Sequence, residues 1–371
     1  MSLIDKNIIN RFVYGIKDAL KIGSSTIVGI DIGLSAVKVA EVVELKGGRY
    51  KLTKYSMIPL SEGALIEDEI QKEEEIIEAI REALVSGKIS SKIASIAISG
   101  PNTVVRKLQL AGGSNDEIED QVLWEAEQYL PFDIDSSTVS SHLFGENLGG
   151  GVDVLMVGAK DDVILRFKDL VEMSGVRVKV VDINAAAITN MFEHVLGDEL
   201  LETESSKILM DIGAQKTTFI IYKSGILNFC KEINVGGSMI TEEIQRQLGV
   251  NFEQAEDLKT TTDKGGNLPE EVLEVVDDVL EIFYKEIKKT VDFYITAMSD
   301  EDFSECWVTG GAMLTPNLVE GLESILKLPV KMFNPLDKIE CDRGNFDDEM
   351  LDSINYCGVT AIGLAMRKFV K

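Results

Sequence analysis

One short pattern occurs twice in the 371-residue chain, and this duplication constrains the fold more than any other feature. The tripeptide Asp-Ile-Gly stands at residues 31–33, within "IVGIDIGLSAVKVAE", and again at residues 211–213, so the second copy follows the first by 180 residues. In both copies an apolar strand leads into the tripeptide, and a second apolar strand follows a few small or polar residues. A single copy is equally typical of a capped hairpin turn, where Asp is favoured. Two copies at matching places predict two lobes related by duplication.

Each copy predicts a meander of three strands. The first copy predicts strands over residues 27–31, 36–44 and 50–57, and the second over residues 207–211, 217–222 and 226–231. A chain of 371 residues is long for a single hydrophobic core, which also favours two lobes. The sequence therefore predicts an α/β protein with a duplicated two-lobe architecture.

An amphipathic helix is predicted over residues 73–86 and a buried strand over residues 93–99, and the pattern then changes near residue 100. Strands are predicted over 103–110, 138–144, 152–159 and 177–182, with an acidic helix over 116–129 and another helix over 161–174. This block predicts a small strand–helix subdomain inserted into the first lobe. The resulting division is an N-terminal helix (1–25), the first lobe (26–100), the insertion (101–180), a return to the first lobe (181–206), the second-lobe core (207–235), a helical subdomain (236–300) and further second-lobe core with the closing helix (301–371).

The first 25 residues predict an amphipathic helix. Apolar side chains recur at helical spacing, at Leu3, Ile4, Ile8, Phe12, Ile16 and Leu20. Basic side chains lie opposite them, at Lys6, Arg11, Lys17 and Lys21. Such a helix suits docking on a partner or lying at a membrane surface. We favour a leader helix that packs on its own domain or frays.

Composition excludes several classes of protein. A formal net charge of −26 disfavours nonspecific binding to nucleic acid or anionic lipid, because either needs a basic surface. Four cysteines without a CxxC pair, together with two histidines, disfavour a zinc site and a Ser–His–Asp or Cys–His mechanism. Reduced thiols of this kind suit the cytoplasm. No apolar run reaches the roughly 18 residues of a membrane-spanning helix.

The two Asp-Ile-Gly turns contain the residue types that bind phosphate. Tight turns present backbone amides to phosphate oxygens, and glycine permits close approach. In the first turn the predicted ligands are Asp31, Gly33, Ser35 and Lys38, with Lys38 as a point charge on the β-phosphate. In the second they are Asp211, Gly213, Thr217 and Thr218. Asp31 and Asp211 could hold a hydrated Mg²⁺ ion between them.

Three further motifs suit a nucleotide site. A helix is predicted over residues 236–248, so Gly236 and Gly237 lie at its N-terminus, which favours anions. The pair Gly310-Gly311 follows a predicted strand at a turn where bare backbone can approach an adenine ring. Glu256 and Lys259 are three residues apart on one helix face, a spacing that by itself favours an ordinary surface ion pair.

The order of these motifs resembles that of the actin-like ATPase superfamily. Its five segments correspond here to Asp31–Lys38 (first phosphate loop), Asp182–Ala187 (first connector), Asp211–Thr218 (second phosphate loop), Gly310-Gly311 (adenosine loop, with Met313) and the terminal "GVTAIGLA" (second connector). The resemblance implies a duplicated ribonuclease-H-like, actin-like fold that binds ATP and Mg²⁺ in a cleft. It also implies that Glu256 and Lys259 lie near the adenosine sugar.

Two longer stretches narrow the resemblance. "GGSMITEEIQRQLGVNFEQAEDLK" is most similar to the cell-division protein FtsA and to the PilM family of type IV pilus proteins, and "WEAEQYLPFDID" at residues 124–135 is typical of the PilM insertion. The resemblance to the PilM family implies a cytoplasmic ATP-binding protein that is peripheral at the inner membrane. Such proteins bind the N-terminal cytoplasmic tail of PilN, join PilO and PilP indirectly, and contact the pilus motor ATPases.

Two alternatives remain open. One is a filament of the FtsA type, although the closing stretch Met366–Lys371 lacks the usual membrane-targeting helix. The other is a sugar or acetate kinase on the same fold, for which Asp182 is the candidate general base. No catalytic residue is assigned. Gln215 and Glu41 lie near the phosphate loops in sequence, but neither is a convincing water-positioning group, so slow or absent ATP turnover is expected.

Overall fold

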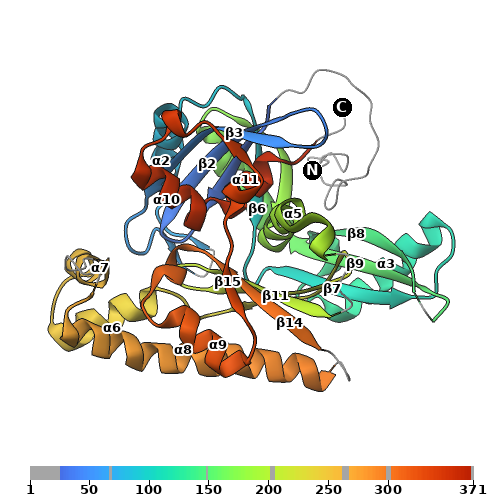
Figure 1. Ribbon diagram of the computed structural model, residues 1–371. Coiled ribbons are helices and arrows are strands. Elements are labelled where there is room, and N and C mark those ends of the chain that lie inside the picture. The colour runs from blue at the N-terminus through green and yellow to red at the C-terminus, as the bar shows by residue number, and fades with distance from the viewer. Residues whose placement is uncertain are drawn as a thin grey trace. The chain divides into compact units, whose positions relative to one another are not determined.

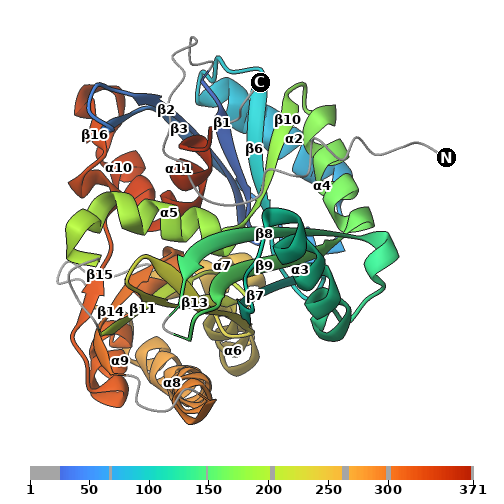
Figure 2. The same cartoon turned by 90° about the vertical axis from the view of Figure 1, so that its right-hand side faces the viewer.

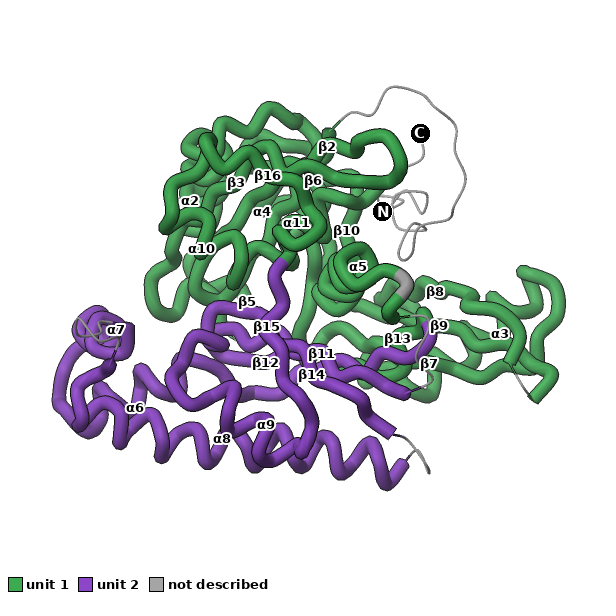
Figure 3. The backbone as a smooth tube through the Cα atoms, in the orientation of Figure 1, with its two compact units in different colours: residues 1–200, 225–230, 335–371 green, residues 201–224, 231–334 purple. Residues whose placement is uncertain are grey.

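The computed structural model (Figure 1) describes residues 26–66, 69–147, 149–200, 205–260, 267–297 and 302–368. The helix predicted for residues 1–25 lies outside the described residues. The chain divides into two compact units, coloured green and purple in Figure 3. Unit 1 comprises residues 1–200, 225–230 and 335–371, and unit 2 comprises residues 201–224 and 231–334.

Unit 1 is built on a six-stranded sheet in the order β10-β6-β1-β2-β3-β16. Its strands are β1 (Val28–Ile32), β2 (Ala36–Glu44), β3 (Tyr50–Pro59), β6 (Ile93–Ile98), β10 (Arg177–Ile183) and β16 (Glu340–Cys341). The first three form the antiparallel meander predicted from the first Asp-Ile-Gly copy, while β6 and β10 continue the sheet parallel to β1. Val28 and Ile30 of β1 are completely buried, as the apolar run before Asp31 predicts.

The sheet associated with unit 2 repeats this plan. Its five strands lie in the order β13-β12-β11-β14-β15, and their bounds are β11 (Ser206–Ile212), β12 (Thr217–Lys223), β13 (Ile226–Ile233), β14 (Phe303–Thr309) and β15 (Val330–Met332). β11 pairs antiparallel with β12 and parallel with β14. Leaving aside β16, both sheets place their strands in the chain order third, second, first, fourth, fifth. This common order confirms the duplicated α/β, ribonuclease-H-like and actin-like fold.

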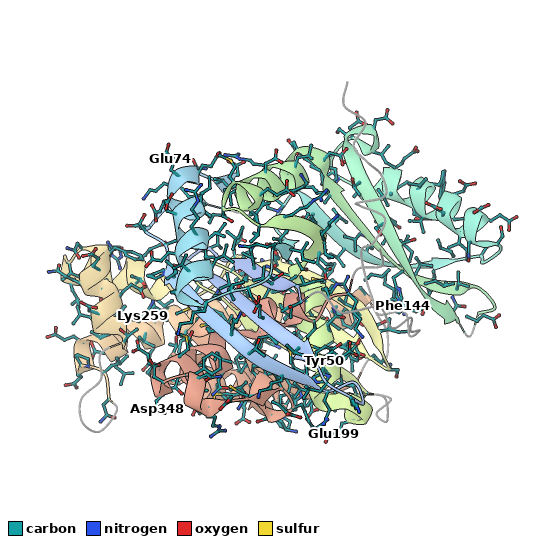
Figure 4. All side chains as sticks on the ribbon, turned by 90° about the horizontal axis from the view of Figure 1, so that it is seen from above. Tyr50, Glu74, Phe144, Glu199, Lys259 and Asp348 are labelled. Carbon is teal, nitrogen blue, oxygen red and sulfur yellow. The ribbon has the colours of Figure 1, made fainter. Side chains whose placement is uncertain are left out.

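Helices cover both faces of the sheet in unit 1. Helices α2 (Glu73–Ser86) and α4 (Asp161–Met173) pack together on one side, where α2 contacts β2 and β3 and α4 contacts β6 and β10. Helices α5 (Asn184–Leu196) and α11 (Val359–Ala365) pack together on the other side (Figure 2). The bounds of α2 are those predicted from its apolar stripe, and Glu74, labelled in Figure 4, lies in its exposed acidic first turn.

The closing helix belongs to unit 1, whereas the sequence placed residues 301–371 in the second lobe. The reason is close packing. A Cβ atom on Gly29 of β1 would overlap the backbone of Ala361, and a Cβ atom on Gly363 would overlap the backbone of Ala187 on α5. The small residues of α11 therefore let it lie directly on β1 and α5. Helix α10 (Asp348–Cys357) precedes it in the same unit.

The inserted subdomain is smaller than predicted. It contains a three-stranded antiparallel sheet, β7-β9-β8, with bounds Thr103–Leu110, Val152–Lys160 and Ser137–Glu146, and helix α3 (Asn115–Tyr129) packs across it (Figure 2). Strand β10 belongs to the main sheet of unit 1 and helix α4 packs on that sheet. The insertion therefore ends near residue 160 and not at residue 180. Two short strands that the sequence did not predict, β4 (Leu65–Ile66) and β5 (Glu69–Ile70), pair with each other.

Unit 2 contains the remaining helices: α6 (Ser238–Leu248), α7 (Phe252–Thr260), α8 (Glu270–Ala297) and α9 (Leu318–Leu326). Helix α8 buries one continuous stripe that includes Val276, Phe283 and Ile287, and it contacts α6 and α9. Among the described residues, no helix combines the length and the apolar composition that crossing a membrane requires.

Candidate functional site

The first Asp-Ile-Gly turn places a carboxylate and an ammonium side by side at the end of β1. Asp31 and Lys38 are direct partners across β1 and β2, because the hairpin pairs residues 28–32 with residues 41–37. Lys38 Nζ lies 3.0 Å from Asp31 Oδ2, and the two side chains are 13% and 11% exposed. The structure thus brings together the two charged residues that the sequence predicted for the first phosphate loop.

The surroundings of Lys38 fix its charge. Burial by itself would lower the pKa of the ammonium, but the Asp31 carboxylate, with Cys357 and Tyr55, raises that pKa above its ordinary value. Lys38 therefore stays protonated across the accessible pH range. Asp31 serves as its counter-ion in this structure.

The tip of this turn is tight. Gly33 N donates to Ala36 O over 3.0 Å, and a Cβ atom on Gly33 would lie 3.0 Å from Lys38 Nζ. Gly33 does not have a positive φ, so the glycine serves close approach and not an unusual backbone angle. Ser35 is exposed at the tip, and its carbonyl accepts from Leu60 N at 2.8 Å. The Ser35 hydroxyl is therefore placed on the surface of the loop.

The second turn repeats this geometry with a different partner. Asp211 faces Thr218 across β11 and β12 in the register that places Asp31 opposite Lys38. Gly213 N donates to Lys216 O over 3.0 Å, as Gly33 N does to Ala36 O in the first turn. Only the first loop therefore has a cation at this strand position.

Thr217 has a structural role that the sequence did not predict. Its side chain is completely buried, and Oγ1 donates to Val235 O over 2.8 Å. Nearby, Lys216 Nζ lies 2.9 Å from Glu232 Oε2. These contacts tie the second loop to the end of β13.

Gly310 folds directly against Asp211. Its φ is 94°, and a Cβ atom there would overlap Asp211 Oδ1 and Ile212 O. Gly311 then begins a short 3₁₀ turn, Gly311–Leu314, in which Met313 is 2% exposed. Within unit 2 the predicted adenosine loop and the second phosphate loop are therefore in contact, and only glycine meets both the angle and the space at residue 310.

The glycine pair before α6 supports the second loop. Gly237 N donates to Gly213 O over 3.0 Å, and Ser238 N donates to Ala214 O over 2.7 Å. A Cβ atom on Gly236 would come within 2.5 Å of Ala214 O. The amides at the start of α6 therefore donate to carbonyls of the second Asp-Ile-Gly turn. The sequence had predicted that these amides would be available to bind an anion.

Glu256 and Lys259 form a cluster at the same place. Lys259 Nζ lies 2.5 Å from Glu256 Oε1, 2.8 Å from Thr241 Oγ1 and 3.5 Å from Gly237 O. Lys259, labelled in Figure 4, is only 17% exposed. Thr241 also donates to Glu256. Thr241 was not predicted from the sequence, because it appears there only as one position on the apolar face of α6. The three-residue spacing of Glu256 and Lys259 favoured an ordinary surface ion pair.

Each Asp-Ile-Gly turn places one carboxylate near the end of a strand. No group of three or more His, Cys, Asp or Glu side chains within the described ranges is arranged to hold a metal. Each loop instead supplies one carboxylate, Asp31 in unit 1 and Asp211 in unit 2. Mg²⁺ commonly takes one or two carboxylates and completes its octahedron with water and substrate phosphate. Within its own unit, each carboxylate is therefore of the kind that Mg²⁺ takes as a ligand.

Asp182, considered as a general base, and Glu41, considered as a water-positioning group, both form ion pairs within the fold. Asp182 is completely buried, with Arg367 Nε 2.7 Å from its Oδ2, so it is not placed to take a proton from an acceptor hydroxyl. Glu41 lies three residues beyond Lys38 on β2, where Lys54 Nζ approaches its Oε2 to 2.8 Å and Ser91 N donates to its Oε1. Gln215 lies in the turn between β11 and β12.

Comparison with known proteins gives a family and a fold. The sequence matches the family model described as type IV pilus assembly protein PilM over residues 29–369. A chain of a PilM–PilN type IV pilus biogenesis complex is similar, with a TM-score of 0.80, 23% identity, and coverage of 92% of this chain and 98% of that chain. The ethanolamine utilization protein EutJ from Carboxydothermus hydrogenoformans matches with a TM-score of 0.52, 16% identity, and coverage of 93% and 90%. At these identities the two structures establish a shared fold.

Proposed function

The chain belongs to the family of the type IV pilus assembly protein PilM, and on this premise we propose that it is a nucleotide-binding scaffold of type IV pilus assembly. The observation that carries the nucleotide part is the repeated register of the two turns. Asp31 faces Lys38 in one, and Asp211 faces Thr218 in the other, with Gly310 folded against Asp211. Carboxylate, lysine, hydroxyl and bare glycine backbone are the groups that bind a Mg²⁺–nucleotide.

In this proposal each loop has its own task. Lys38 leaves Asp31 and pairs with a phosphate, the Ser35 hydroxyl donates to the phosphates, and Gly33 and Gly213 let the backbone of their turns approach closely. Glu256 and Lys259 hold the sugar, and Gly310, Gly311 and Met313 border the base. Bound Mg²⁺ supplies the positive charge that offsets the phosphates, and Asp31 and Asp211 hold it through water.

ATP turnover is slow or absent in this proposal. In-line attack on a γ-phosphate needs a group that positions water. Glu41 and Asp182 are both engaged in buried ion pairs, which leaves Gln215 as the candidate near the loops. In this proposal the protein senses whether ATP is bound and does not hydrolyse it rapidly.

The proposed partners follow the family. The short N-terminal cytoplasmic tail of PilN binds this chain, PilO and PilP join indirectly, and the pilus motor ATPases contact the assembly. The similar fold of a chain in a PilM–PilN type IV pilus biogenesis complex supports PilN as the first partner to test. The chain then acts at the inner membrane through its partners.

Isothermal titration tests the nucleotide site. Wild-type protein is expected to bind Mg²⁺–ATP, and Lys38→Ala to weaken binding at least about tenfold, because a charge-assisted contact to phosphate is lost. Lys54→Ala is the matched control, since Lys54 on β3 pairs with Glu41 on β2 in the same meander, away from the turn. Absence of heat with wild-type protein would remove the nucleotide part of the proposal.

A pull-down tests the partner. An immobilised peptide with the sequence of a PilN N-terminal tail should retain the wild-type chain, in amounts that differ with and without Mg²⁺–ATP. A peptide of the same composition in scrambled order is the control. Equal retention by both peptides would argue against PilN binding.

A further inference from the structure

Helix α3 in the inserted subdomain carries two large apolar side chains on its outer side. Its inner side packs Ile118, Val122 and Ala126 into the core beneath it. Leu123 and Trp124 are 41% and 62% exposed. At about 100° per residue they project away from the inner stripe. A Trp and a Leu together on an outer helix face indicate a surface that another element covers.

The same face is strongly acidic. The 15 residues of α3 contain six acids and no Lys or Arg. Asp116 lies two turns and Asp120 one turn before Trp124, and Glu127 lies one turn after Leu123. Among the ion pairs between described residues, none involves an acid of α3. The element that covers this face should therefore be both apolar and basic.

The chain itself contains a segment of that chemistry. Residues 1–21 have four basic and two acidic side chains, whereas the rest of the chain has a net charge of −28. Their apolar residues recur every three or four positions, from Leu3 to Leu20. The segment precedes β1, which belongs to the same unit as α3.

We propose that residues 1–21 dock as an amphipathic helix on the outer face of α3 of the same chain. The apolar stripe covers Leu123 and Trp124, and the basic residues face Asp116, Asp120 and Glu127. The lengths agree, because residues 3–20 would span about 27 Å as a helix and α3 spans about 22 Å. The contact need not be strong, since tethering gives an effective concentration on the order of millimolar. This inference is independent of the nucleotide and of PilN.

Trp124 itself reports the docking. The chain has two tryptophans, so Trp307→Phe leaves Trp124 as the single tryptophan, whose emission is excited selectively at the red edge of the absorption band. In this background the full chain is compared with residues 26–371 by acrylamide quenching. At about 50 mM salt the quenching constant should be at least about twofold lower for the full chain, and the difference should vanish near 500 mM salt. Equal quenching of the two chains at low salt would overturn the proposal.

Charge exchange tests the same contact without shortening the chain. The triple variant Asp116→Lys, Asp120→Lys, Glu127→Lys should raise quenching to the level of the shortened chain. Adding Lys6→Glu, Lys17→Glu and Lys21→Glu should restore protection. The matched control is Glu270→Lys, Glu274→Lys, Asp278→Lys, on exposed positions of α8 at four-residue spacing, which should leave quenching unchanged. Failure of the exchange to restore protection would also count against the contact.

Two arms exclude other occupants. Protection that stays constant over a roughly hundredfold range of protein concentration supports docking within one chain, whereas protection that grows with concentration assigns the segment to a second copy and overturns the proposal. Vesicles with anionic lipid test a membrane. If residues 1–25 confer vesicle binding while Trp124 is equally quenched in both chains, the segment serves the lipid and the α3 proposal fails.

Discussion

Gly310 illustrates how much the site depends on single residues. Its positive φ and its contact with Asp211 and Ile212 exclude any side chain, so Gly310→Ala should destabilise the protein by about 3 kcal/mol or more and weaken Mg²⁺–ATP binding. Gly33→Ala is the contrast. Its φ is ordinary, and a Cβ atom there would lie 3.0 Å from Lys38 Nζ and 3.1 Å from Ala36 O, contacts that small shifts relieve, so a loss of about 1 kcal/mol or less is expected. Urea unfolding measures both, and equal losses would contradict this reading of the backbone.

The ionisation of the single residue Glu305 makes the stability of the fold depend on pH. Burial would raise the pKa of Glu305, but hydrogen bonds from Lys207 and Lys331 outweigh it and lower the pKa to about 2. A carboxyl group with a depressed pKa stabilises the fold above its unfolded value, near 4.5, and loses that contribution as the pH falls toward 2. Glu305→Gln should therefore cost about 1–2 kcal/mol at pH 7 and much less near pH 2.

The control for Glu305 is Glu243. Its pKa is also lowered to about 2, by hydrogen bonds from Arg246 and Gln247, but Arg246 is 70% exposed, whereas Lys207, the partner of Glu305, is 7% exposed. Solvent screens such pairs, so Glu243→Gln should produce no measurable change in stability at either pH. Equal losses for the two variants in urea unfolding would show that burial does not decide the effect.

At the scale of elements, periodicity predicted what is local. The bounds of α2 were predicted because Ile76, Ile77 and Ile80 repeat at helical spacing and Gly87 follows the helix. The pair β4–β5 was not predicted, since two-residue strands show no period. The start of α6 was predicted two residues early, because the amides of Gly237 and Ser238 donate to carbonyls of the second Asp-Ile-Gly turn. That partner lies more than 20 residues away, so no local pattern reveals it.

The closing helix shows the same limit and offers a test. Alanine normally stabilises a helix interior relative to glycine, by about 1 kcal/mol. Gly363→Ala should do the reverse and destabilise unit 1 by about 2 kcal/mol or more, because the new Cβ atom would overlap the backbone of α5 at Ala187. The sign of the change, measured by urea unfolding, distinguishes close packing from helix propensity. A stabilised variant would contradict the contact between α11 and α5.

For the whole molecule, the duplication was the most predictive feature of the sequence. Two Asp-Ile-Gly turns predicted two related sheets, and the structure gives both the same strand order and the same register at Asp31 and Asp211. The sequence alone could not show which sheet a given strand or helix joins. Helix α4 and strand β10 look locally like part of the insertion, yet β10 pairs with β6 over long range. The same reason explains why residues 335–371 belong to unit 1.

The proposed use of both turns by one nucleotide is testable in the intact chain. Hydrogen exchange with and without Mg²⁺–ATP should show added protection at residues 33–38 of unit 1 and at residues 213–218 of unit 2, because each turn contributes amides to the phosphates. Asp211→Asn should reduce the protection of both segments together, since losing one carboxylate weakens the shared ion. Asp257→Asn, on α7 outside the loops, is the control. If the nucleotide protects one segment and leaves the other unchanged, the second Asp-Ile-Gly is a structural relic of the duplication, and the protein senses ATP with a single loop.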